Sequence, residues 1–349
     1  MGKKKTQSLF DDATTKGIIK KYGEVVRSGT DVFEETKNLQ IIPVSPAIDL
    51  ALGGGIQEGS WVLLTGDPKS GKTTTALQFA SNCQKEEYGD RPIIYLNAEG
   101  RLKSMNLSGI DGLKIEDIKI IESNEEPMSA EEYLDIAEAY IKQFPKCVLI
   151  VDSTSTLTPE RELTDSLSGQ FRAGLPKILA AFTRRMSGVV RKQKAIIVLI
   201  THFISNTSGM GYKTKLPDGG VKIQYQADTR MEVKYFKSWE ADDEPVGQMV
   251  VWKVFCSSVG PPGKEAESWI RYGKGVDKTK ELIHMGCELG LIGKSGAWYS
   301  CDFLLGRNEL LPDGVEESQK FQGQEKLYSF IEENPPVLSL LEEELKAML

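Results

Sequence analysis

The sequence has few of the residues that build disulfide frameworks and metal centres. Its five cysteines are scattered along the 349 residues without any C-x-x-C pair: Cys83, Cys147, Cys256, Cys287 and Cys301. This spacing argues against a disulfide scaffold and against a structural zinc site. Only two histidines are present, His202 and His284, so a histidine-based metal centre is not expected either.

Long apolar runs and a secretory leader are also missing. The longest apolar runs, residues 147–151 and 195–200, are far shorter than the roughly 20 residues that span a bilayer. Residues 1–6 are rich in lysine but lack the apolar stretch and the cleavage site of a secretory signal. These absences predict a cytoplasmic protein.

An excess of positive charge is lacking too, because the net charge is −7. A surface that is acidic overall repels phosphate groups, so nucleic acid could bind only where cations are gathered locally. Any DNA site must therefore be a concentrated basic patch.

Short β-rich apolar runs that alternate with longer helical segments are what the sequence does contain. Strands are predicted at residues 61–65, 93–97, 147–151, 195–201, 229–235 and 249–255, and helices at 72–88, 130–144 and 174–192. This alternation is typical of an α/β fold with a mainly parallel, twisted sheet covered on both faces.

Changes in pattern along the chain indicate three parts. Residues 7–28 predict one amphipathic helix and residues 29–38 a linker, and together they make up the first part, 1–40. Residues 41–275 form the α/β core. Beyond residue 275, helices are predicted at 278–289, 325–333 and 338–348, which indicates a small α+β C-terminal domain over 276–349.

A phosphate-binding motif follows the first predicted strand of the core and opens the first core helix. Its residues fit G-x-x-x-x-G-K-[ST]: Gly66-Asp67-Pro68-Lys69-Ser70-Gly71-Lys72-Thr73. In this context the backbone N–H groups surround phosphates, Lys72 reaches the β and γ phosphates, and Thr73 holds Mg²⁺. The nucleotide is expected to bind these eight residues together with Thr74 and Asp152.

Two acidic residues follow other predicted strands of the core. Asp152 follows the run 148–151, the arrangement that places a carboxylate near the nucleotide's metal ion. Glu99 follows the strand at 93–97 and would emerge at the same edge of the sheet, where ligands of open α/β folds bind. There it could polarise the water that attacks the γ-phosphate. The alternative is that Glu99 is a surface residue that only caps the turn after the strand.

Several segments resemble the RecA family, well beyond the phosphate-binding motif. Asn97-Ala98-Glu99 is similar to the family's D-A-E segment, and Val151-Asp152-Ser153 with Leu157-Thr158-Pro159 is similar to its V-D-S and L-T-P segments. Gly219-Gly220 resembles the end of its second DNA-binding loop. The run Gly296-Ala297-Trp298-Tyr299-Ser300 and the stretch from Gly323-Gln324 to Asn334-Pro335 resemble the small C-terminal domain of bacterial RecA.

The resemblance implies a RecA-type P-loop ATPase core and a recombinase function. Such a protein would bind ATP and Mg²⁺, form a helical homo-oligomeric filament on single-stranded DNA, and exchange strands with homologous duplex DNA. Lys72, Glu99 and His202 would be its catalytic residues. His202 would sense the γ-phosphate and relay the nucleotide state to the loop that begins at Phe203. The alternative is a histidine that only forms hydrogen bonds at the end of a strand and has no role in sensing.

A basic stretch supplies the cations that DNA binding needs. Between Arg161 and Lys194, eight lysines and arginines face two acidic residues. A solvated helix face could show the same charge, but the resemblance favours DNA loops at 164–172 and 203–220. The residues expected to bind DNA are Arg172, Lys177, Arg184, Arg185, Lys213, Gly219 and Gly220.

Some segments depart from the bacterial pattern. Cys256-Ser257-Ser258 stands where bacterial RecA has a K-x-K pair that reaches the phosphates across the subunit joint, so Lys253, Lys264 or a bound cation would have to replace it. The adenine-stacking tyrosine after Glu99 is missing, and Met105 is a substitute. The resemblance also implies that the first part, 1–40, serves oligomerisation. Its helix, the segment Val32-Phe33 and Tyr225 could lie at the subunit joint or pack within the chain.

Two alternatives stay open at this stage. The acidic stretch from Asp313 to Leu349 could screen the DNA path or form a solvated terminal helix. A RecA-fold ring ATPase without strand exchange, such as a helicase or a regulatory ATPase, is the alternative function.

Overall fold

The computed structural model describes residues 13–23, 25–164, 174–205, 215–241, 243–307, 311, 316 and 319–348. The chain divides into two compact units, residues 1–40 and 41–349. Among the described residues, no helix combines the length and the apolar character needed to cross a membrane.

The first unit contains two short helices, α1 (Ala13–Tyr22) and α2 (Gly29–Lys37). The prediction of a linker at 29–38 is therefore wrong. Helix α2 forms because Ser28 caps it, accepting a hydrogen bond from the Asp31 amide at 3.0 Å, and because Asp31 and Lys37 complement the helix dipole. Neither helix buries a side chain.

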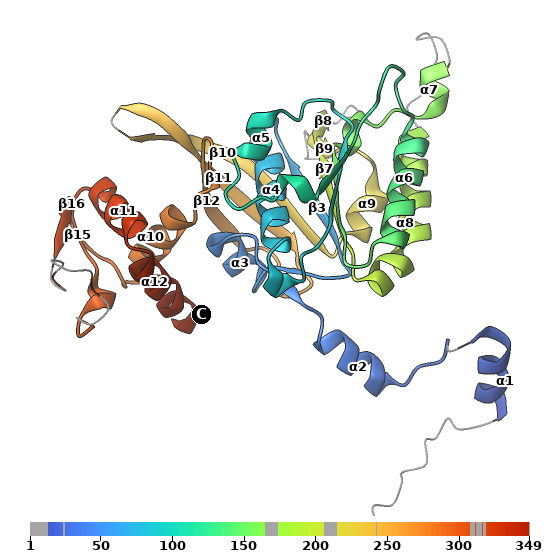
Figure 1. The fold of residues 1–349 in the computed structure, drawn as a ribbon, viewed down its shortest axis with the longest axis horizontal. Helices are drawn as coiled ribbons and strands as arrows, with labels where there is room; N and C mark the ends of the chain where they lie inside the picture. The colour runs from blue at the N-terminus through green and yellow to red at the C-terminus, as the bar shows by residue number, and fades with distance from the viewer. Residues whose placement is uncertain are drawn as a thin grey trace, which may run out of the picture. The chain divides into compact units, whose positions relative to one another are not determined.

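A nine-stranded sheet forms the centre of the second unit (Figure 1). Its strands, in spatial order, are β13 (Gly275–Val276), β12 (Glu265–Arg271), β11 (Glu244–Cys256), β10 (Thr229–Ala241), β3 (Trp61–Gly66), β7 (Ile196–Thr201), β6 (Val148–Asp152), β4 (Ile93–Asn97) and β5 (Ile118–Ile121). The strands from β10 to β5 pair in parallel, and those from β10 to β13 pair antiparallel. The predicted α/β fold with a mainly parallel sheet is thus confirmed.

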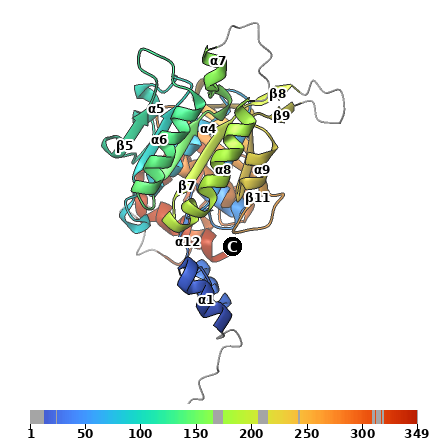
Figure 2. The same ribbon diagram turned by 90° about the vertical axis from the view of Figure 1, so that its right-hand side faces the viewer.

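Both faces of the central parallel strands β3, β4, β6 and β7 are buried, which explains their apolar runs. Alternate residues of β4 belong to different clusters: Ile93 and Tyr95 pack on the side of α4 (Lys72–Cys83), whereas Ile94 and Leu96 pack on the side of α6 (Ala130–Gln143) and α8 (Gly174–Gln193). Helices α6 and α8 run side by side (Figure 2). The phosphate-binding motif therefore starts from a strand that is fixed on both faces.

The remaining elements of the core are short. They are β1 (Ile41–Ile42), α3 (Pro46–Leu52), β2 (Ile56–Gln57), α5 (Ser104–Ser108), α7 (Glu160–Thr164), β8 (Phe203–Ser205), β9 (Lys215–Pro217) and α9 (Val221–Gln226). Strands β8 and β9 pair antiparallel, so the two ends of the predicted second loop lie together. Residues 206–214 between them, and residues 165–173 of the predicted first loop, lie outside the described part of the chain.

Several element bounds differ from the prediction for local reasons. Helix α4 ends at Cys83, and a separate 3₁₀ turn at Glu86–Tyr88 is closed by Gly89 at φ 93°. Strands β10 and β11 are longer than predicted because they continue beyond the sheet as a two-stranded ribbon. Strands β5 and β12 were not predicted, because polar residues interrupt their apolar pattern.

After β13 the chain forms a group of helices and a small antiparallel sheet. The helices are α10 (Lys278–Glu288), α11 (Gln324–Glu333) and α12 (Pro335–Met348), and the strands are β14 (Gly293–Ser295), β15 (Trp298–Ser300) and β16 (Lys320–Gln322). The small C-terminal domain expected from the sequence is present as an α+β structure. Acidic residues of its last helix pair within the chain, Glu342 with Lys278 and Lys346, and Glu344 with Arg307.

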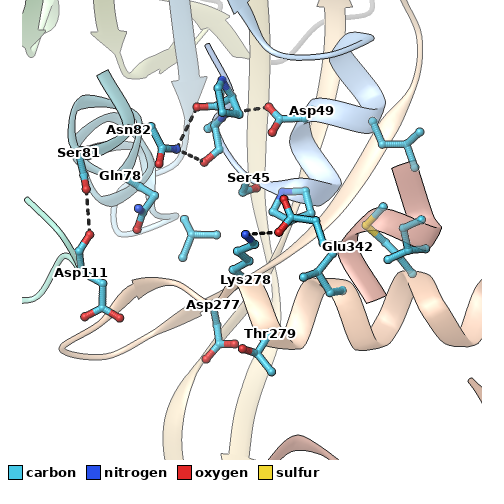
Figure 3. A pocket seen from close by; sticks show the side chains of 18 of the residues that line it. Ser45, Asp49, Gln78, Ser81, Asn82, Asp111, Asp277, Lys278, Thr279 and Glu342 are labelled. Atoms are coloured by element: carbon cyan, nitrogen blue, oxygen red, sulfur yellow. Dashed lines mark hydrogen bonds and ion pairs between the residues drawn. The ribbon is translucent and has the colours of Figure 1, made fainter. Parts of the chain in front are cut away.

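Buried polar contacts join this domain to the core. Glu281 of α10 is fully buried and accepts hydrogen bonds from the Ala47 amide at 3.0 Å, from Ser45 Oγ at 3.1 Å and from Ser268 Oγ. Burial raises the pKa of Glu281 to about 7. A cavity of about 1170 Å³ lies beside these contacts, and its lining includes Asn82 and the ion-paired Lys278 (Figure 3).

Candidate nucleotide site

The phosphate-binding motif forms a tight loop between the end of β3 and the start of α4. Gly71 has φ 96°, which favours glycine, and a Cβ there would stand 2.1 Å from Ile270 Cδ1. Thr73 and Thr74 lie in the first turn of α4. Since the first N–H groups of a helix have no partner within the helix, this loop presents donors to an anion.

Lys72 is the cation of this loop. Its side chain is buried at 4% exposure, and Nζ donates to the carbonyl oxygens of Gly66 and Asp67, both at 2.9 Å. Burial lowers the pKa of Lys72, while the nearby carboxylates Asp152 and Glu99 act in the opposite direction. The amine is therefore held inside the loop, where the sequence predicted a phosphate contact.

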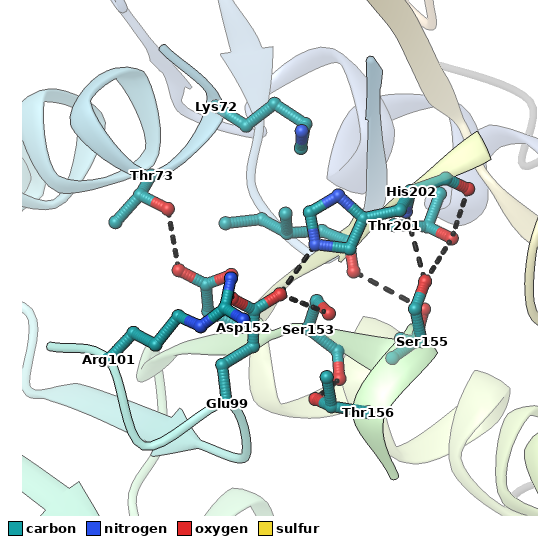
Figure 4. Close-up of polar contacts among 12 residues, drawn as sticks. Lys72, Thr73, Glu99, Arg101, Asp152, Ser153, Ser155, Thr156, Thr201 and His202 are labelled. Carbon is teal, nitrogen blue, oxygen red and sulfur yellow. Dashed lines mark hydrogen bonds and ion pairs between the residues drawn. The ribbon is translucent and has the colours of Figure 1, made fainter. Parts of the chain in front are cut away.

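Asp152 faces the loop from the neighbouring part of the sheet (Figure 4). Its Oδ2 atom accepts a hydrogen bond from Thr73 Oγ1 at 2.6 Å and a second from the Tyr95 hydroxyl, also at 2.6 Å. Burial and the neighbouring Asp152 raise the pKa of Tyr95, so the phenol keeps its proton. Thr73 and Asp152, the two residues predicted to hold Mg²⁺, are thus in direct contact.

Glu99 and His202 form the second half of the site. Glu99 Oε1 lies 2.5 Å from His202 Nε2 and accepts a hydrogen bond from Ser153 Oγ at 2.8 Å (Figure 4). The His202 contact, followed by the Ser153 hydrogen bond, lowers the pKa of Glu99 to about 2 against the effect of burial. Glu99 is therefore an ionised carboxylate over the physiological pH range.

The structure brings the three predicted catalytic residues, Lys72, Glu99 and His202, to one edge of the sheet. The reason is that β3, β4, β6 and β7 run parallel, so that the segments after their carboxyl ends meet. The second ring nitrogen of His202, Nδ1, is buried and has no hydrogen-bond partner among the described residues. A buried nitrogen without a hydrogen-bond partner is suited to bond a ligand that binds in the site.

His202 is also joined to the end of the second loop. The His202 amide donates to Ser155 Oγ at 3.0 Å, and its carbonyl accepts from the Asp218 amide at 2.9 Å. Gly219 and Gly220 follow at φ 85° and 87°. A Cβ on Gly220 would lie 3.0 Å from Pro176 in the first turn of α8, so the loop end packs closely on that helix.

The structure separates the residues that were predicted to bind DNA. Lys177 is exposed in the first turn of α8, beside the two glycines, whereas Arg184 lies about 10 Å further along the helix. Arg185 is ion-paired with Glu138 at 2.6 Å and with Asp135 at 3.7 Å, both on α6. Arg172 and Lys213 lie outside the described residues.

Gln248 and Ile270 complete the loop but were missed in the sequence. The Gln248 side chain donates to the Lys69 carbonyl at 3.2 Å, and Ile270 packs on Gly71. Both residues come from strands far along the chain, and no motif marks them. Tyr95 was missed as well, because a tyrosine inside an apolar strand looks like any core residue.

The suggested substitutes for missing family residues have other contacts. Lys253 pairs with Glu265 at 3.2 Å, and Lys264 Nζ donates to the Leu50 carbonyl at 3.4 Å. Ser257 Oγ donates to the Leu52 carbonyl at 2.8 Å. Met105 is 70% exposed and Tyr225 is 83% exposed, so both are accessible to a ligand or a neighbouring subunit.

The donor set fits a magnesium-bound nucleotide. A buried ammonium and a helix N-terminus suit phosphates, and a hydroxyl bonded to a carboxylate suits Mg²⁺, which prefers oxygen ligands.

Comparison with known proteins gives one consistent answer. The sequence model of the RecA N-terminal domain matches residues 11–277, and that of the RecA C-terminal domain matches residues 280–349. A protein named Protein RecA from Campylobacter lari is 30% identical over 342 residues, 97% of this chain and 92% of that protein. Proteins of the same name from Campylobacter fetus subsp. fetus and Xanthomonas euvesicatoria pv. vesicatoria are 29% and 28% identical, covering 99% and 93% of this chain and 94% and 88% of their own lengths.

Proposed function

The chain belongs to the RecA family, and on that premise we propose that it is an ATP-dependent homologous recombinase. It forms a helical filament on single-stranded DNA, hydrolyses ATP to ADP and phosphate there, and catalyses homologous pairing and strand exchange. The observation that carries this proposal is the contact between Glu99 and His202, because His202 is also bonded to the end of the second loop.

Glu99 acts as the general base of hydrolysis. Its carboxylate accepts a hydrogen bond from the attacking water, orients it toward the γ-phosphate, and takes up the proton. Lys72 neutralises charge on the β and γ phosphates, and Ser153 keeps the Glu99 carboxylate in place. Thr73 and Asp152 would hold Mg²⁺, which would supply positive charge next to the phosphates.

His202 links hydrolysis to DNA binding. Its Nε2 atom bonds Glu99 in the structure, and its ring turns to the γ-phosphate when ATP is bound, so that Glu99 is released to the water. Because the His202 backbone is bonded to Ser155 and Asp218, this movement shifts Gly219 and Gly220 and the loop before them. The bound nucleotide thereby controls the affinity for DNA.

The DNA-binding surface lies at the start of α8 and in the two loops. Lys177, Arg172 and Lys213 contact phosphates, while Gly219 and Gly220 let the loop backbone approach the strand. Arg184 and Arg185 add positive charge further along α8. In this arrangement the base edges are left free to pair with a homologous strand.

Hydrolysis assays with and without single-stranded DNA test the enzymatic part of the proposal. We expect single-stranded DNA to stimulate ATP hydrolysis in the wild type, and Lys72→Ala to abolish hydrolysis. Electron microscopy with ATP and single-stranded DNA tests the assembly. Helical filaments with extended DNA are expected, whereas closed rings on unextended DNA would support a ring ATPase and contradict the recombinase.

A further inference from the structure

Tyr95 carries a hydroxyl group into a layer that is otherwise apolar. It is the third residue of β4, it is 1% exposed, and it belongs to the cluster that contains Ile93, Val148 and Ile150. A polar atom in such a place costs free energy unless it is hydrogen-bonded. The tyrosine hydroxyl meets this requirement by donating to Asp152 at the end of the neighbouring strand β6.

The Tyr95 hydroxyl and the Thr73 hydroxyl donate to the same oxygen of Asp152. Both distances are 2.6 Å, and the donors come from different elements, β4 and the first turn of α4. Two donors on one carboxylate oxygen fix the rotation of the carboxyl group about its last bond. A short hydrogen bond from a neutral donor to a carboxylate is stronger than one between neutral groups.

The division of roles between the two donors follows from their positions. Thr73 is the residue predicted to ligate Mg²⁺ through its oxygen, and it can do so while its proton points at Asp152. Tyr95 lies in the buried layer beneath, where it can hold the carboxylate but cannot contact a nucleotide. The carboxylate thus stays in the orientation that Thr73 needs.

We propose that Tyr95 is a positioning residue for the metal half of the nucleotide site: it fixes Asp152, which in turn orients the Thr73 hydroxyl for Mg²⁺. This inference rests on the proposed function, since it presumes that the site binds a magnesium-bound nucleotide. We expect Tyr95 to contribute nothing to nucleotide binding in the absence of a divalent cation, because its hydroxyl donates to Asp152, whereas Lys72 is held by the carbonyl oxygens of Gly66 and Asp67.

The test compares the affinity for a fluorescent, non-hydrolysable ATP analogue in EDTA and in saturating Mg²⁺. For Tyr95→Phe, which keeps the ring and removes only the hydroxyl, we expect unchanged affinity in EDTA and an affinity about tenfold weaker than wild type in Mg²⁺. The Mg²⁺ concentration that gives half of the maximal gain in affinity should rise by a similar factor.

Tyr133→Phe is the matched control. Tyr133 is also buried, and its hydroxyl also forms hydrogen bonds, with the Ser123 amide and Ser123 Oγ at 3.0 Å, but it lies on α6. The control should show the wild-type gain in affinity on adding Mg²⁺. Melting temperatures of both variants report the general cost of losing a buried hydroxyl.

Three results would overturn the role of Tyr95. These are an unchanged Mg²⁺-dependent gain in Tyr95→Phe, an equal loss of affinity with and without Mg²⁺, and an equal loss of the Mg²⁺-dependent gain in Tyr133→Phe. A different result would remove the proposed function instead, namely a wild-type protein that binds no nucleotide in either condition. The two failures are therefore distinguishable.

Discussion

At the scale of single residues, Glu99 is ionised and its carboxylate is held in place by neighbouring side chains. Three side chains surround it: Ser153 and His202 hold one oxygen, and Arg101 lies 3.7 Å from the other. The His202 contact is the largest cause of the low pKa of Glu99, so this carboxylate becomes a stronger base when His202 turns to the γ-phosphate, as proposed for the ATP-bound state.

We expect Glu99→Gln to lower the rate of ATP hydrolysis at least about 100-fold, because an amide cannot accept the proton. Nucleotide affinity and filament formation should persist, since Lys72 and the loop are unchanged. Steady-state hydrolysis and electron microscopy measure the two properties. The control is Glu116→Gln, the same substitution at an exposed glutamate outside the nucleotide site. Hydrolysis at the wild-type rate in Glu99→Gln would remove Glu99 from its role.

Glu281 gives the stability of the protein a pH dependence. The folded pKa of about 7 lies above the ordinary value of 4.5, so the folded protein holds a proton that the unfolded chain has lost. The stability from this group is fully present below pH 4.5 and is lost as the pH rises through 7. Glu281→Gln, which cannot ionise, should show a flatter profile of the free energy of unfolding between about pH 4.5 and about pH 7.

Urea unfolding at several pH values measures this effect as the free energy of unfolding. Glu288→Gln is the matched control, because Glu288 ends the same helix but is exposed. Parallel profiles for wild type and Glu281→Gln would contradict the prediction.

At the scale of elements, helix α8 has different environments along its length. Pro176 in its first turn packs against Gly220, whereas Arg185, in its middle, is paired with α6. The first turn is therefore close to the described end of the second loop. The local charge excess predicted a basic helix correctly but could not say which of its cations are engaged by other helices.

We expect Lys177→Ala to weaken binding to single-stranded DNA more than Arg185→Ala does. Each lost phosphate contact should also reduce the slope of log affinity against log salt by about 0.7. Fluorescence anisotropy over a salt titration gives both quantities. Equal losses in the two variants, or no loss in either, would count against a DNA path at the start of α8.

At the scale of the whole molecule, residues 1–40 form a unit of their own whose two helices bury no side chain. No described residue before Ile42 belongs to either cluster, and Ile18, Ile19 and Phe33 are exposed. Apolar residues on short helices that bury nothing within the chain suit contact with a second copy. Residues 41–349 contain Lys72, Thr73, Glu99, Asp152 and His202.

Removal of residues 1–40 should therefore leave nucleotide binding unchanged and abolish filament assembly on single-stranded DNA. Affinity for a fluorescent ATP analogue and electron microscopy of the truncated protein check the two parts. Normal filaments from the truncated protein would show that residues 1–40 do not join subunits. Loss of nucleotide binding would show that they are needed for the fold.

The sequence alone determined the features whose signals are local. Contiguous residues form the phosphate-binding motif, strand ends carry Glu99, Asp152 and His202, and parallel strands bring such ends together whatever the rest of the chain does. Local patterns were also enough for the α/β class. They failed at residues 29–38, where capping by Ser28 forms a helix in a stretch without an apolar core.

Only the tertiary structure decided which distant side chains complete the site. Gln248 and Ile270 reach the loop because the antiparallel strands β11 and β12 lie beside it, and Tyr95 reaches Asp152 because β4 and β6 pair in register. Whether Arg185 is available depends on the packing of α6 against α8. Such contacts arise from pairing and packing between segments far apart in sequence, so local sequence patterns cannot predict them.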